Sequence, residues 1–324
     1  MKILVTGGAG YIGSITTRKL IEEGHNVVVF DNLSTGHKEN VFCKLVVGDL
    51  LNPEDIKTGL KNEHFDAVIH FAGKALARES MQKPSDYLNN NINGGINLLE
   101  YMRINGISNI VFSSTCAIYG FSNKLPVSEN EDKLPVSIYG ESKLIFEKIL
   151  SWYDQIYKIK NVCLRYFNAA GASLDYSIGE MHSNETHIIP LAIEKAIRGD
   201  PFSLFGSNYP TSDGTCVRDY IHVEDLAIAH IKAINYLRKN NESNCFNLGT
   251  GKGYSNLQIL KAIEDISHLT IDIEYKEKRV GDPPIIYANN SKASDILKFR
   301  PQYSDLDTII KTAWNWHKKS LSVY

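Results

Sequence analysis

KILVTGGAGYIG, residues 2–13, joins a short apolar run to glycines in the spacing GxxGxxG. The run 2–6 is typical of a buried strand. In the stretch after the glycines, Ile12, Ile15 and Leu20 fall near one helical face. A strand, a tight turn and a helix in this order direct the free N–H groups of a helix N-terminus toward any anion that lies at the turn.

Each glycine suits a different need of such a turn. Gly7 permits the tight turn, Gly10 lets a pyrophosphate approach the backbone, and Gly13 lets the helix pack close to the sheet. Asp31 ends the next apolar run, 26–30, and lies 18 residues beyond Gly13. An acid near this position accepts hydrogen bonds from the adenosine ribose and repels a 2′-phosphate, so the pattern predicts NAD rather than NADP. Taken alone, the glycines would indicate only a turn, and Asp31 in DNLSTG also suits a turn.

Short apolar runs continue to alternate with helix-like stretches. The further runs are 44–49, 67–73, 109–114 and 161–167, and the helix-like stretches include 85–104 and 139–157. Wholly apolar strands that alternate with helices predict a parallel sheet covered on both faces. Together with the glycine turn, they predict an α/β fold of the Rossmann type, with a doubly wound parallel sheet.

The alternation fades after about residue 171. The stretches 170–190 and 204–225 are expected to be long loops, and loops of this length in a compact chain indicate function. The run 245–249 is expected to be a strand that returns to the main sheet. We therefore predict a NAD-binding Rossmann domain and a smaller C-terminal α/β lobe that mainly binds the substrate. The Rossmann domain is expected over residues 1–171, joined by a returning segment near 219–249. The smaller lobe is expected mainly over residues 172–324.

The composition narrows the class of protein. The 324 residues carry a net charge of −2 with a pI near 6.6, and this lack of basic excess argues against a nucleic-acid partner. Five scattered cysteines without a CxxC pair indicate reduced thiols, with neither a disulfide framework nor a metal site. The N-terminus lacks a signal-peptide pattern, and no apolar run approaches the length of a membrane span. We expect a cytoplasmic protein with no membrane partner.

SIYGESK, residues 137–143, places Tyr139 and Lys143 on one face of an expected helix. A surface helix with a mixed face is the simplest alternative. A free phenol has a pKa of about 10, and a neighbouring ammonium together with the cationic ring of oxidised nicotinamide lowers it toward the range of a general base. Because the glycine turn predicts that nicotinamide, the pair is interpreted as a base and its tuning cation. Thr115 in FSSTCAIYG (112–120) adds a hydroxyl at the carboxyl end of a strand, although local backbone capping is an alternative role.

Several motifs carry a resemblance to a known family. They are GGAGYIG, HFAG, SSTCAIYG, YGESK, RYFNAAGA, DGTCVRDYIHVED and RVGDPP. In this order and spacing they resemble the extended short-chain dehydrogenase/reductase family, from residue 1 to about 317. The resemblance implies an enzyme that uses NAD to invert C4 of a UDP-hexose through a transient 4-keto sugar, with glucose and galactose as the sugars and the N-acetyl forms left open. It also implies a homodimer built on the helices 85–104 and 139–157.

The resemblance further implies a role for each residue that matches a family motif. Tyr139 takes the proton of the sugar 4-hydroxyl, Thr115 assists, and Lys143 holds the nicotinamide ribose. The expected cofactor contacts are Gly7, Gly10, Tyr11, Ile12, Gly13, Asp31, Asn32, Thr35, Gly36, Asp49, Leu50, Phe71, Ala72, Gly73, Lys74, Asn90, Ser113, Tyr139, Lys143 and Phe167. The expected substrate contacts are Thr115, Asn168, His187, Phe205, Arg218, Arg279, Asp282 and Ile286. Arginines suit a diphosphate through bidentate hydrogen bonds, whereas a strand-end acid such as Asp49 or a loop histidine such as His187 is also common without function.

A few positions depart from the family pattern. Lys74 directly follows FAG, where some members carry their lysine one place later. Arg78 stands where glycine is frequent, and is either a surface cation or a residue that favours an acidic sugar. Ile138 replaces a frequent proline at the helix entry. Ile286 aligns with the family's gate residue and has an intermediate size, which leaves acceptance of N-acetyl sugars open.

Other activities compete on the same scaffold. A nucleotide-sugar 4,6-dehydratase needs an acid and a base beside the hydroxyl residue, but Cys116 and Ala117 stand there. A UDP-uronate epimerase or decarboxylase is favoured only by Arg78. A non-catalytic NAD-sensing protein would not need Tyr139 and Lys143, and both are present.

Overall fold

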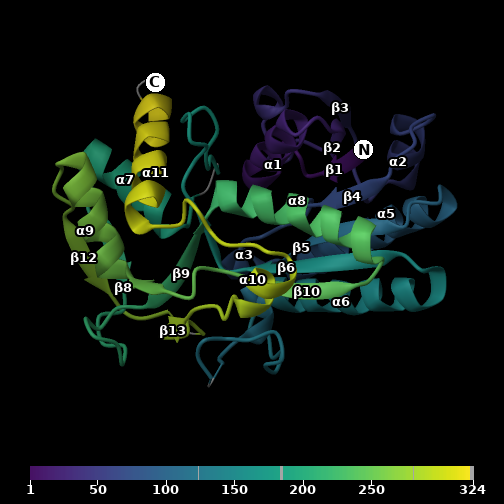
Figure 1. The fold of residues 1–324 in the computed structure, drawn as a ribbon. Coiled ribbons are helices and arrows are strands. Elements are labelled where there is room, and N and C mark those ends of the chain that lie inside the picture. The colour runs from purple at the N-terminus through teal and green to yellow at the C-terminus, as the bar shows by residue number, and fades with distance from the viewer. Residues whose placement is uncertain (123, 183–184, 280, 322–324) are drawn as a thin grey trace.

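The computed structural model describes residues 1–122, 124–182, 185–279 and 281–321. Val280 of the RVGDPP motif and residues 183–184 of the predicted loop 170–190 lie outside these ranges. Figure 1 shows a larger part built on a sheet and a smaller lobe beside it, with helix α8 (Val223–Asn240) running along the sheet. Within the described ranges, no helix combines the length and the apolar character that a membrane span requires.

The larger part is a seven-stranded parallel sheet in the order β10-β6-β5-β4-β1-β2-β3. Its strands are β1 (Lys2–Thr6), β2 (Asn26–Asp31), β3 (Lys44–Val47), β4 (Ala67–His70), β5 (Asn109–Thr115), β6 (Lys160–Tyr166) and β10 (Asn244–Leu248). The predicted strands are confirmed, including the returning strand, which lies at the edge beside β6. The order of the strands reverses between β1 and β4, so the chain winds outward in both directions from this point.

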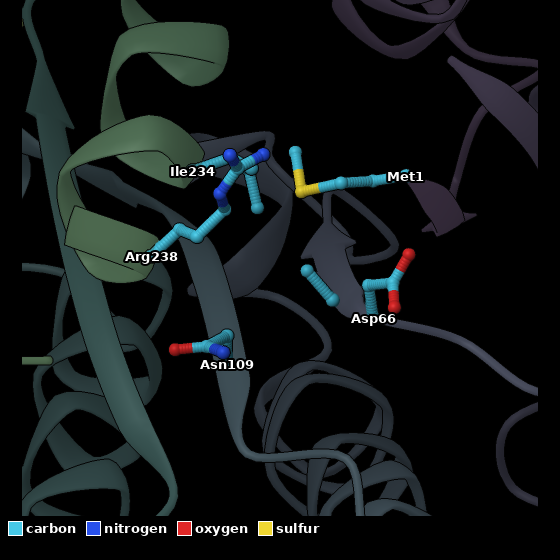
Figure 2. Close-up of a pocket in the computed structure, with 6 residues that line it drawn as sticks. Met1, Asp66, Asn109, Ile234 and Arg238 are labelled. Carbon is cyan, nitrogen blue, oxygen red and sulfur yellow. The ribbon is translucent and has the colours of Figure 1, made fainter.

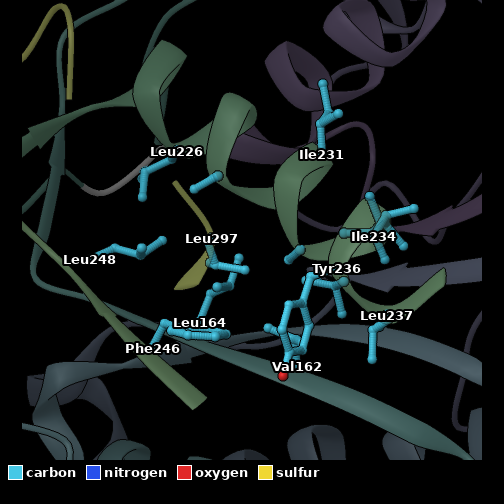
Figure 3. Close-up of a cluster of buried hydrophobic side chains, with 14 of the residues drawn as sticks. Val162, Leu164, Leu226, Ile231, Ile234, Tyr236, Leu237, Phe246, Leu248 and Leu297 are labelled. Carbon is cyan, nitrogen blue, oxygen red and sulfur yellow. The ribbon is translucent and has the colours of Figure 1, made fainter. Parts of the chain in front are cut away.

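Helices cover both faces of the sheet, as the wholly apolar strands require. One face carries α1 (Tyr11–Glu22), α8 and α10 (Ser291–Ile296), and the other carries α2 (Pro53–Gly59), α5 (Gly94–Ile104) and α6 (Ile138–Tyr157). Figure 3 shows the first of these cores, where Leu164 of β6 and Phe246 of β10 lie below Leu226 and Ile234 of α8. The predicted fold class, a doubly wound α/β sheet, is confirmed.

The predicted helix 85–104 has a feature that its sequence pattern does not show. Helix α4 (Pro84–Leu88) passes through a π-helical segment, η2 (Asn89–Asn93), before it continues as α5. π-helical segments are rare and often lie at functional sites, because they shift side chains out of the α-helical register. Short helical turns elsewhere are η1 (Lys38–Asn40), α3 (Ala77–Ser80) and η3 (Cys116–Tyr119).

The smaller lobe has a core of its own. Parallel strands β8 (Phe202–Phe205) and β12 (Ile273–Lys276) pack with α7 (Ile188–Arg198), α9 (Asn256–Ser267) and α11 (Leu306–Leu321). Next to them, β9 (Val217–His222) pairs with β7 (Asn168–Ala170), β11 (Gly253–Ser255) and β13 (Ile285–Ile286). Because α8 and β10 separate α7 from α9 along the chain, the lobe is assembled from two stretches on either side of this return to the main sheet.

The predicted loop 204–225 is wrong in its second half. Residues 217–222 form β9, and α8 begins at Val223. The acid Asp219 breaks the hydrophobic pattern of this strand, yet its side chain is fully buried. It is tolerated there because its carboxylate accepts hydrogen bonds from the backbone N–H groups of Thr250 and Gly251, at 2.9 and 3.0 Å.

A buried ion pair joins α6 to β6. The Nη2 atom of Arg165 lies 2.6 Å from Glu147 Oε2, and its Nε atom lies 2.9 Å from Glu147 Oε1. Arg165 Nη1 donates to the Tyr119 hydroxyl at 2.9 Å, and Glu147 also accepts a hydrogen bond from the Ser114 hydroxyl at 2.5 Å. A pair satisfied in this way holds two elements in register, whereas the loss of one partner leaves a buried charge.

Arg165→Met is expected to lower the free energy of unfolding by about 3–5 kcal/mol, because the Glu147 carboxylate stays buried without its partner. Urea-induced unfolding measures the change. Lys261→Met is the matched control, since it removes an exposed pair with Asp265 on α9, and it should leave unfolding unchanged. If the two variants lower the free energy of unfolding equally, the buried pair contributes no more to stability than the exposed pair.

Candidate active site

The carboxyl ends of the strands meet where the strand order reverses, between β1 and β4. Open α/β sheets bind ligands in the crevice outside this point. The cavity in Figure 2, of about 360 Å³, lies at the opposite end of the sheet. Its lining residues lie at the amino ends of β1, β4 and β5 and on α8, and they are Met1, Asp66, Ala67, Asn109, Ile234 and Arg238. The residues expected to bind the cofactor and the substrate therefore belong to a separate site.

The glycine turn combines two crowded positions with one open one. A Cβ atom on Gly7, whose φ is +73°, would lie 2.4 Å from the backbone nitrogen of Ala72, and one on Gly13 would lie 2.2 Å from the Gly7 oxygen. At Gly10 the nearest atom to an added Cβ would be the Gly7 oxygen, at 3.4 Å. Gly10 is also the N-cap of α1 and offers no side chain to the first N–H groups of the helix. The turn thus leaves helix N–H groups uncapped beside open space, and this fits the pyrophosphate of a dinucleotide.

Asp31 has the turn role that its sequence context allowed, and its carboxylate stays able to take the predicted cofactor role. Its carboxylate is almost buried and accepts hydrogen bonds from the Ala9 N–H at 2.9 Å and the Leu33 N–H at 2.8 Å. It therefore ties the glycine turn to the loop after β2. Each carboxylate oxygen can accept a second hydrogen bond, so Asp31 can still bind ribose hydroxyls. Asn32 reaches the other predicted acid, because its side-chain amide donates to Asp49 at 3.1 Å.

Tyr139, Thr115 and Lys143 converge at the carboxyl end of β5. Ser137 caps α6 by accepting a hydrogen bond from the Gly140 N–H at 3.1 Å, so Tyr139 lies in the first turn of the helix. A hydrogen bond from Thr115 lowers the pKa of the Tyr139 phenol, so the two side chains lie within reach of each other. Lys143 is almost fully buried, and its Nζ donates to the Ser113 carbonyl at 2.9 Å. A hydroxyl pair and an ammonium group therefore face the same end of the sheet as the glycine turn.

The protein's own groups raise the pKa of the Tyr139 phenol, so the lowering expected from Lys143 together with a bound nicotinamide stays a prediction. Burial raises the pKa of Tyr139 to about 12, and the hydrogen bond from Thr115 opposes this rise only in part. Lys143 is not among the groups that shift it, and burial lowers the pKa of Lys143 itself to about 8. Desolvation outweighs the attraction between the two groups, because each is buried before a ligand adds charge. A working base at Tyr139 requires a further positive charge.

Asn91 is a polar residue at the centre of this region that the sequence patterns did not single out. Its side-chain oxygen accepts a hydrogen bond from the Lys74 N–H at 2.8 Å, and its amide donates to the Lys74 carbonyl and to the Ser142 hydroxyl, both at 3.0 Å. It thereby joins the segment after β4 to α6. Asn90, the predicted contact, donates to Asn91 at 3.0 Å. No sequence pattern marks Asn91, because the π-helical segment that carries it is seen only in the folded chain.

The residues expected to hold the UDP group meet in two contacts. The guanidinium of Arg279 lies 4.1 Å from the centre of the Phe205 ring, and Arg218 pairs with Asp282. Asn168 donates from its side chain to the Asp219 carbonyl at 2.9 Å, which places it beside Arg218 on β9. The structure thus brings residues from both stretches of the smaller lobe against β9. An aromatic ring, guanidinium groups and a carboxylate fit a base, a diphosphate and ribose hydroxyls, respectively.

The positions that depart from the family pattern lie around the same region. Ile286 pairs in register with Arg218 and packs in a buried cluster with Phe167, while Lys74 lies over the ring of Tyr87, with its Nζ 5.8 Å from the ring centre. Arg78 is exposed on α3, the helix whose Ser80 accepts the Tyr139 N–H at 3.0 Å. Ile138 is the first residue of α6.

Two further side chains have pKa values that bear on the chemistry. Burial raises the pKa of the Cys116 thiol to about 12, so this residue is a poor acid-base catalyst of the kind that a dehydratase needs. His187 lies against Glu180, which is the main reason that its pKa rises to about 9.

The remaining predicted cofactor residues line the same end of the sheet. Ala72 and Phe71 both donate from their backbone N–H groups to the Thr6 carbonyl, which brings the end of β4 against the glycine turn. A Cβ atom on Gly73 would lie 3.4 Å from Lys143 Nζ, and one on Gly36 would lie 2.8 Å from the Ala9 side chain. The other predicted contacts in this region are Tyr11, Ile12, Thr35, Leu50 and Ser113. Together these residues fit NAD, because Gly10 leaves room for a pyrophosphate and Asp31 has acceptor capacity for a ribose.

The sequence matches the model of the NAD dependent epimerase/dehydratase family over residues 3–249. The chain belongs to this family, as the resemblance of its motifs predicted. Within the family it is similar to the UDP-glucose 4-epimerase of Streptococcus mutans, with 48% identity over 323 residues, 98% of this chain and 97% of the relative.

Solved structures extend this similarity to the fold. The structure of UDP-glucose 4-epimerase from Brucella ovis in complex with NAD matches with a TM-score of 0.94 and 43% identity, over 97% of both chains. That of UDP-glucose 4-epimerase from Bifidobacterium longum in complex with NAD⁺ and UDP matches with a TM-score of 0.94 and 32% identity, over 100% of both chains.

Two glycine variants separate cofactor binding from folding. Gly10→Ala is expected to leave thermal stability nearly unchanged, because its Cβ meets no atom closer than 3.4 Å, but to weaken NAD binding at least tenfold by filling the space at the helix N-terminus. Gly13→Ala should lower stability as well, because its Cβ would lie 2.2 Å from the Gly7 oxygen. Thermal unfolding and NAD titration measure the two effects. Unchanged NAD affinity in Gly10→Ala would place the pyrophosphate elsewhere.

Proposed function

We propose that this chain is a UDP-hexose 4-epimerase, which interconverts UDP-glucose and UDP-galactose through a transient 4-keto sugar. The observation that carries the proposal is the convergence of Tyr139, Thr115 and Lys143 opposite a glycine turn that fits NAD, in a member of an NAD-dependent epimerase/dehydratase family. Relatives named UDP-glucose 4-epimerase support it over nearly the whole chain.

The proposed chemistry assigns one task to each side chain. When bound, NAD⁺ would supply a hydride acceptor for C4 of the sugar and, in its reduced form, the hydride donor that makes this oxidation reversible. Tyr139 accepts the proton of the 4-hydroxyl and later returns it, while the hydrogen bond from Thr115 holds the phenol oxygen toward the sugar. The pKa of Tyr139 in the chain alone is about 12, so its deprotonation needs the positive charge of the oxidised nicotinamide. Lys143, held by the Ser113 carbonyl, binds the nicotinamide ribose.

The UDP group is assigned to the contacts on β9 and the smaller lobe. We propose that residues 1–171, with the returning segment near 219–249, bind NAD, and that 172–324 mainly bind the UDP-sugar. Arg218 and Arg279 would each bind a phosphate, Asp282 would accept from the uridine ribose, and Phe205 would stack near the base. The register of Ile286 with Arg218 supports a position for this residue at the edge of the sugar site.

The range of sugars that the site accepts depends on two of the positions that depart from the family pattern. An isoleucine at position 286 is of intermediate size, so UDP-N-acetylglucosamine is a candidate second substrate. Arg78 is exposed on α3, the helix that meets the first turn of α6, and a UDP-uronate is the alternative that it favours. Initial rates on UDP-galactose, UDP-N-acetylglucosamine and UDP-glucuronate rank these possibilities. Turnover of UDP-galactose without added NAD supports the proposal, a 6-deoxy-4-keto product supports a dehydratase, and binding without turnover supports a sensor.

Tyr139→Phe is expected to lower kcat on UDP-galactose by about 10²–10⁴-fold, because it removes the group that accepts and returns the proton. Bound NAD, measured by absorbance after denaturation of the purified protein, should remain. Tyr153→Phe is the control on the same helix, since the Tyr153 hydroxyl donates to Glu100 at 2.7 Å, away from Thr115. Full activity of Tyr139→Phe would show that another group is the base.

We also propose a homodimer that forms through α5 and α6. Large apolar side chains remain exposed on these helices, with Trp152 and Ile156 each 61% exposed and Ile104 at the end of α5 72% exposed. A buried interface would remove this apolar surface from water.

The free thiols of all five cysteines support the cytoplasm as the compartment of this protein.

Trp152→Glu is expected to convert the dimer to a monomer, because a carboxylate would be buried at the centre of the proposed interface. Light scattering coupled to size-exclusion chromatography measures the mass. Ile296→Glu changes an apolar side chain on α10 that is 44% exposed, and it should leave the dimer intact. If the wild-type chain is monomeric at micromolar concentration, the proposed interface is wrong.

A further inference from the structure

Four potential metal ligands converge in the segment between β7 and α7. Glu180, His182, Glu185 and His187 each offer one nitrogen or oxygen atom, and these four atoms lie within 4.8 Å of one another. We propose that they form a site for one divalent transition metal ion of the Zn²⁺ class. This inference does not use the proposed epimerase activity, but it assigns His187, which the resemblance makes a substrate contact, to the metal ion instead. The cysteine pattern predicts no metal site, but this set of ligands contains no cysteine.

Two of the separations between the ligand atoms are close to those of a tetrahedral zinc site, because His182 Nδ1 lies 3.3 Å from Glu180 Oε1 and 3.3 Å from Glu185 Oε2. His187 Nδ1 lies only 2.5 Å from Glu180 Oε1, so His187 would have to move outward when an ion binds. In a tetrahedron with metal–ligand distances of about 2.0–2.2 Å, neighbouring ligand atoms are about 3.3–3.6 Å apart. His187 is the most exposed of the four, with 52% of its side chain accessible, so it is free to adjust when an ion binds.

The chemistry of the ligands also favours this class of ion. Two imidazole nitrogens and two carboxylate oxygens suit Zn²⁺, whereas Ca²⁺ and Mg²⁺ prefer oxygen alone. Both carboxylates are largely removed from water, with 5% of the Glu180 side chain and 10% of the Glu185 side chain exposed. A divalent ion would neutralise these two buried negative charges. The four protein ligands complete a tetrahedral shell, which is typical of a structural site.

Contacts around the ligands hold the backbone of the site in place. Glu185 Oε1 accepts hydrogen bonds from the N–H groups of Thr186 and His187, at 2.7 and 2.8 Å. The Glu180 carbonyl accepts a hydrogen bond from Trp316 Nε1 of α11 at 3.2 Å. Outer partners of this kind orient metal ligands. A bound ion would therefore fasten the segment that precedes α7 to the α11 side of the smaller lobe.

The alternative is that the same four side chains hold protons in place of a metal, with each imidazolium paired to a carboxylate. Metal analysis separates the two. Purified protein is stripped with a chelator, dialysed and titrated with Zn²⁺ alone, and the stoichiometry is checked by elemental analysis. We expect one Zn²⁺ per chain and a rise in the midpoint of thermal unfolding, because the ion binds the folded state. In protein loaded with Co²⁺, we expect the intense visible bands of tetrahedral coordination, without thiolate charge-transfer bands.

Two variants test the assignment of the ligands. His182→Gln and Glu185→Gln should each weaken Zn²⁺ binding at least about tenfold, since even changes in outer-sphere partners cost that much, and should abolish the thermal shift. His64→Gln, which removes an exposed histidine outside the site, should bind as the wild type does. Circular dichroism confirms that each variant is folded. Absence of Zn²⁺ binding in the wild type, octahedral or thiolate-type Co²⁺ spectra, or equal loss in His64→Gln would overturn the proposal and leave a proton-bound cluster.

Discussion

The buried ammonium of Lys143 is the interaction on which the arrangement of the site depends. Its Nζ has the Ser113 carbonyl as a partner at 2.9 Å and lies 4.8 Å from the centre of the Phe112 ring. Both partners belong to β5, so this bond fixes the rotation of α6 against the strand. Tyr139, one turn earlier on α6, is thereby brought to the hydroxyl of Thr115 at the end of β5.

Burying these ionisable groups costs free energy of folding. Burial lowers the pKa of Lys143 to about 8 and that of nearby His70 to about 3, and each shift reports the cost of keeping a charge away from water. Nε2 of His70 is buried without a hydrogen-bond partner among the described residues. Unsatisfied groups of this kind cost about 1–3 kcal/mol each. Several polar and ionisable groups are thus buried unfavourably at the carboxyl ends of the strands. This is typical of a site that is organised for a ligand before the ligand binds.

The threading of the chain explains how one site receives residues from both parts of the molecule. Helix α8 and β10 return to the main sheet between the two stretches that build the smaller lobe. Strand β9, which enters α8 directly, therefore lies where the two parts meet and carries Arg218. Arg279 and Asp282 reach this region from the second stretch, and Phe205 reaches it from the first. The proposed metal cluster lies just before α7 in the first stretch and bonds to α11 of the second, so it joins the same two stretches.

The predictions from sequence succeeded where the cause is local. Apolar runs at 2–6 and 67–73 are buried strands because their own residues require cover on both faces, and Gly7 and Gly13 are needed because no Cβ fits at either position. Predictions failed where a distant partner changes the outcome: Asp219 is buried in β9 only because the backbone around Thr250 and Ala288 satisfies its carboxylate. The raised pKa of Tyr139 has the same kind of origin, since the desolvation that causes it comes from the surrounding fold. Hydrophobic period and residue size were thus enough for the parallel sheet and its glycine turn. The contacts of Asn91, the cluster around Glu180 and the meeting of Phe205 with Arg279 required the folded chain, because each joins groups whose proximity no local pattern records.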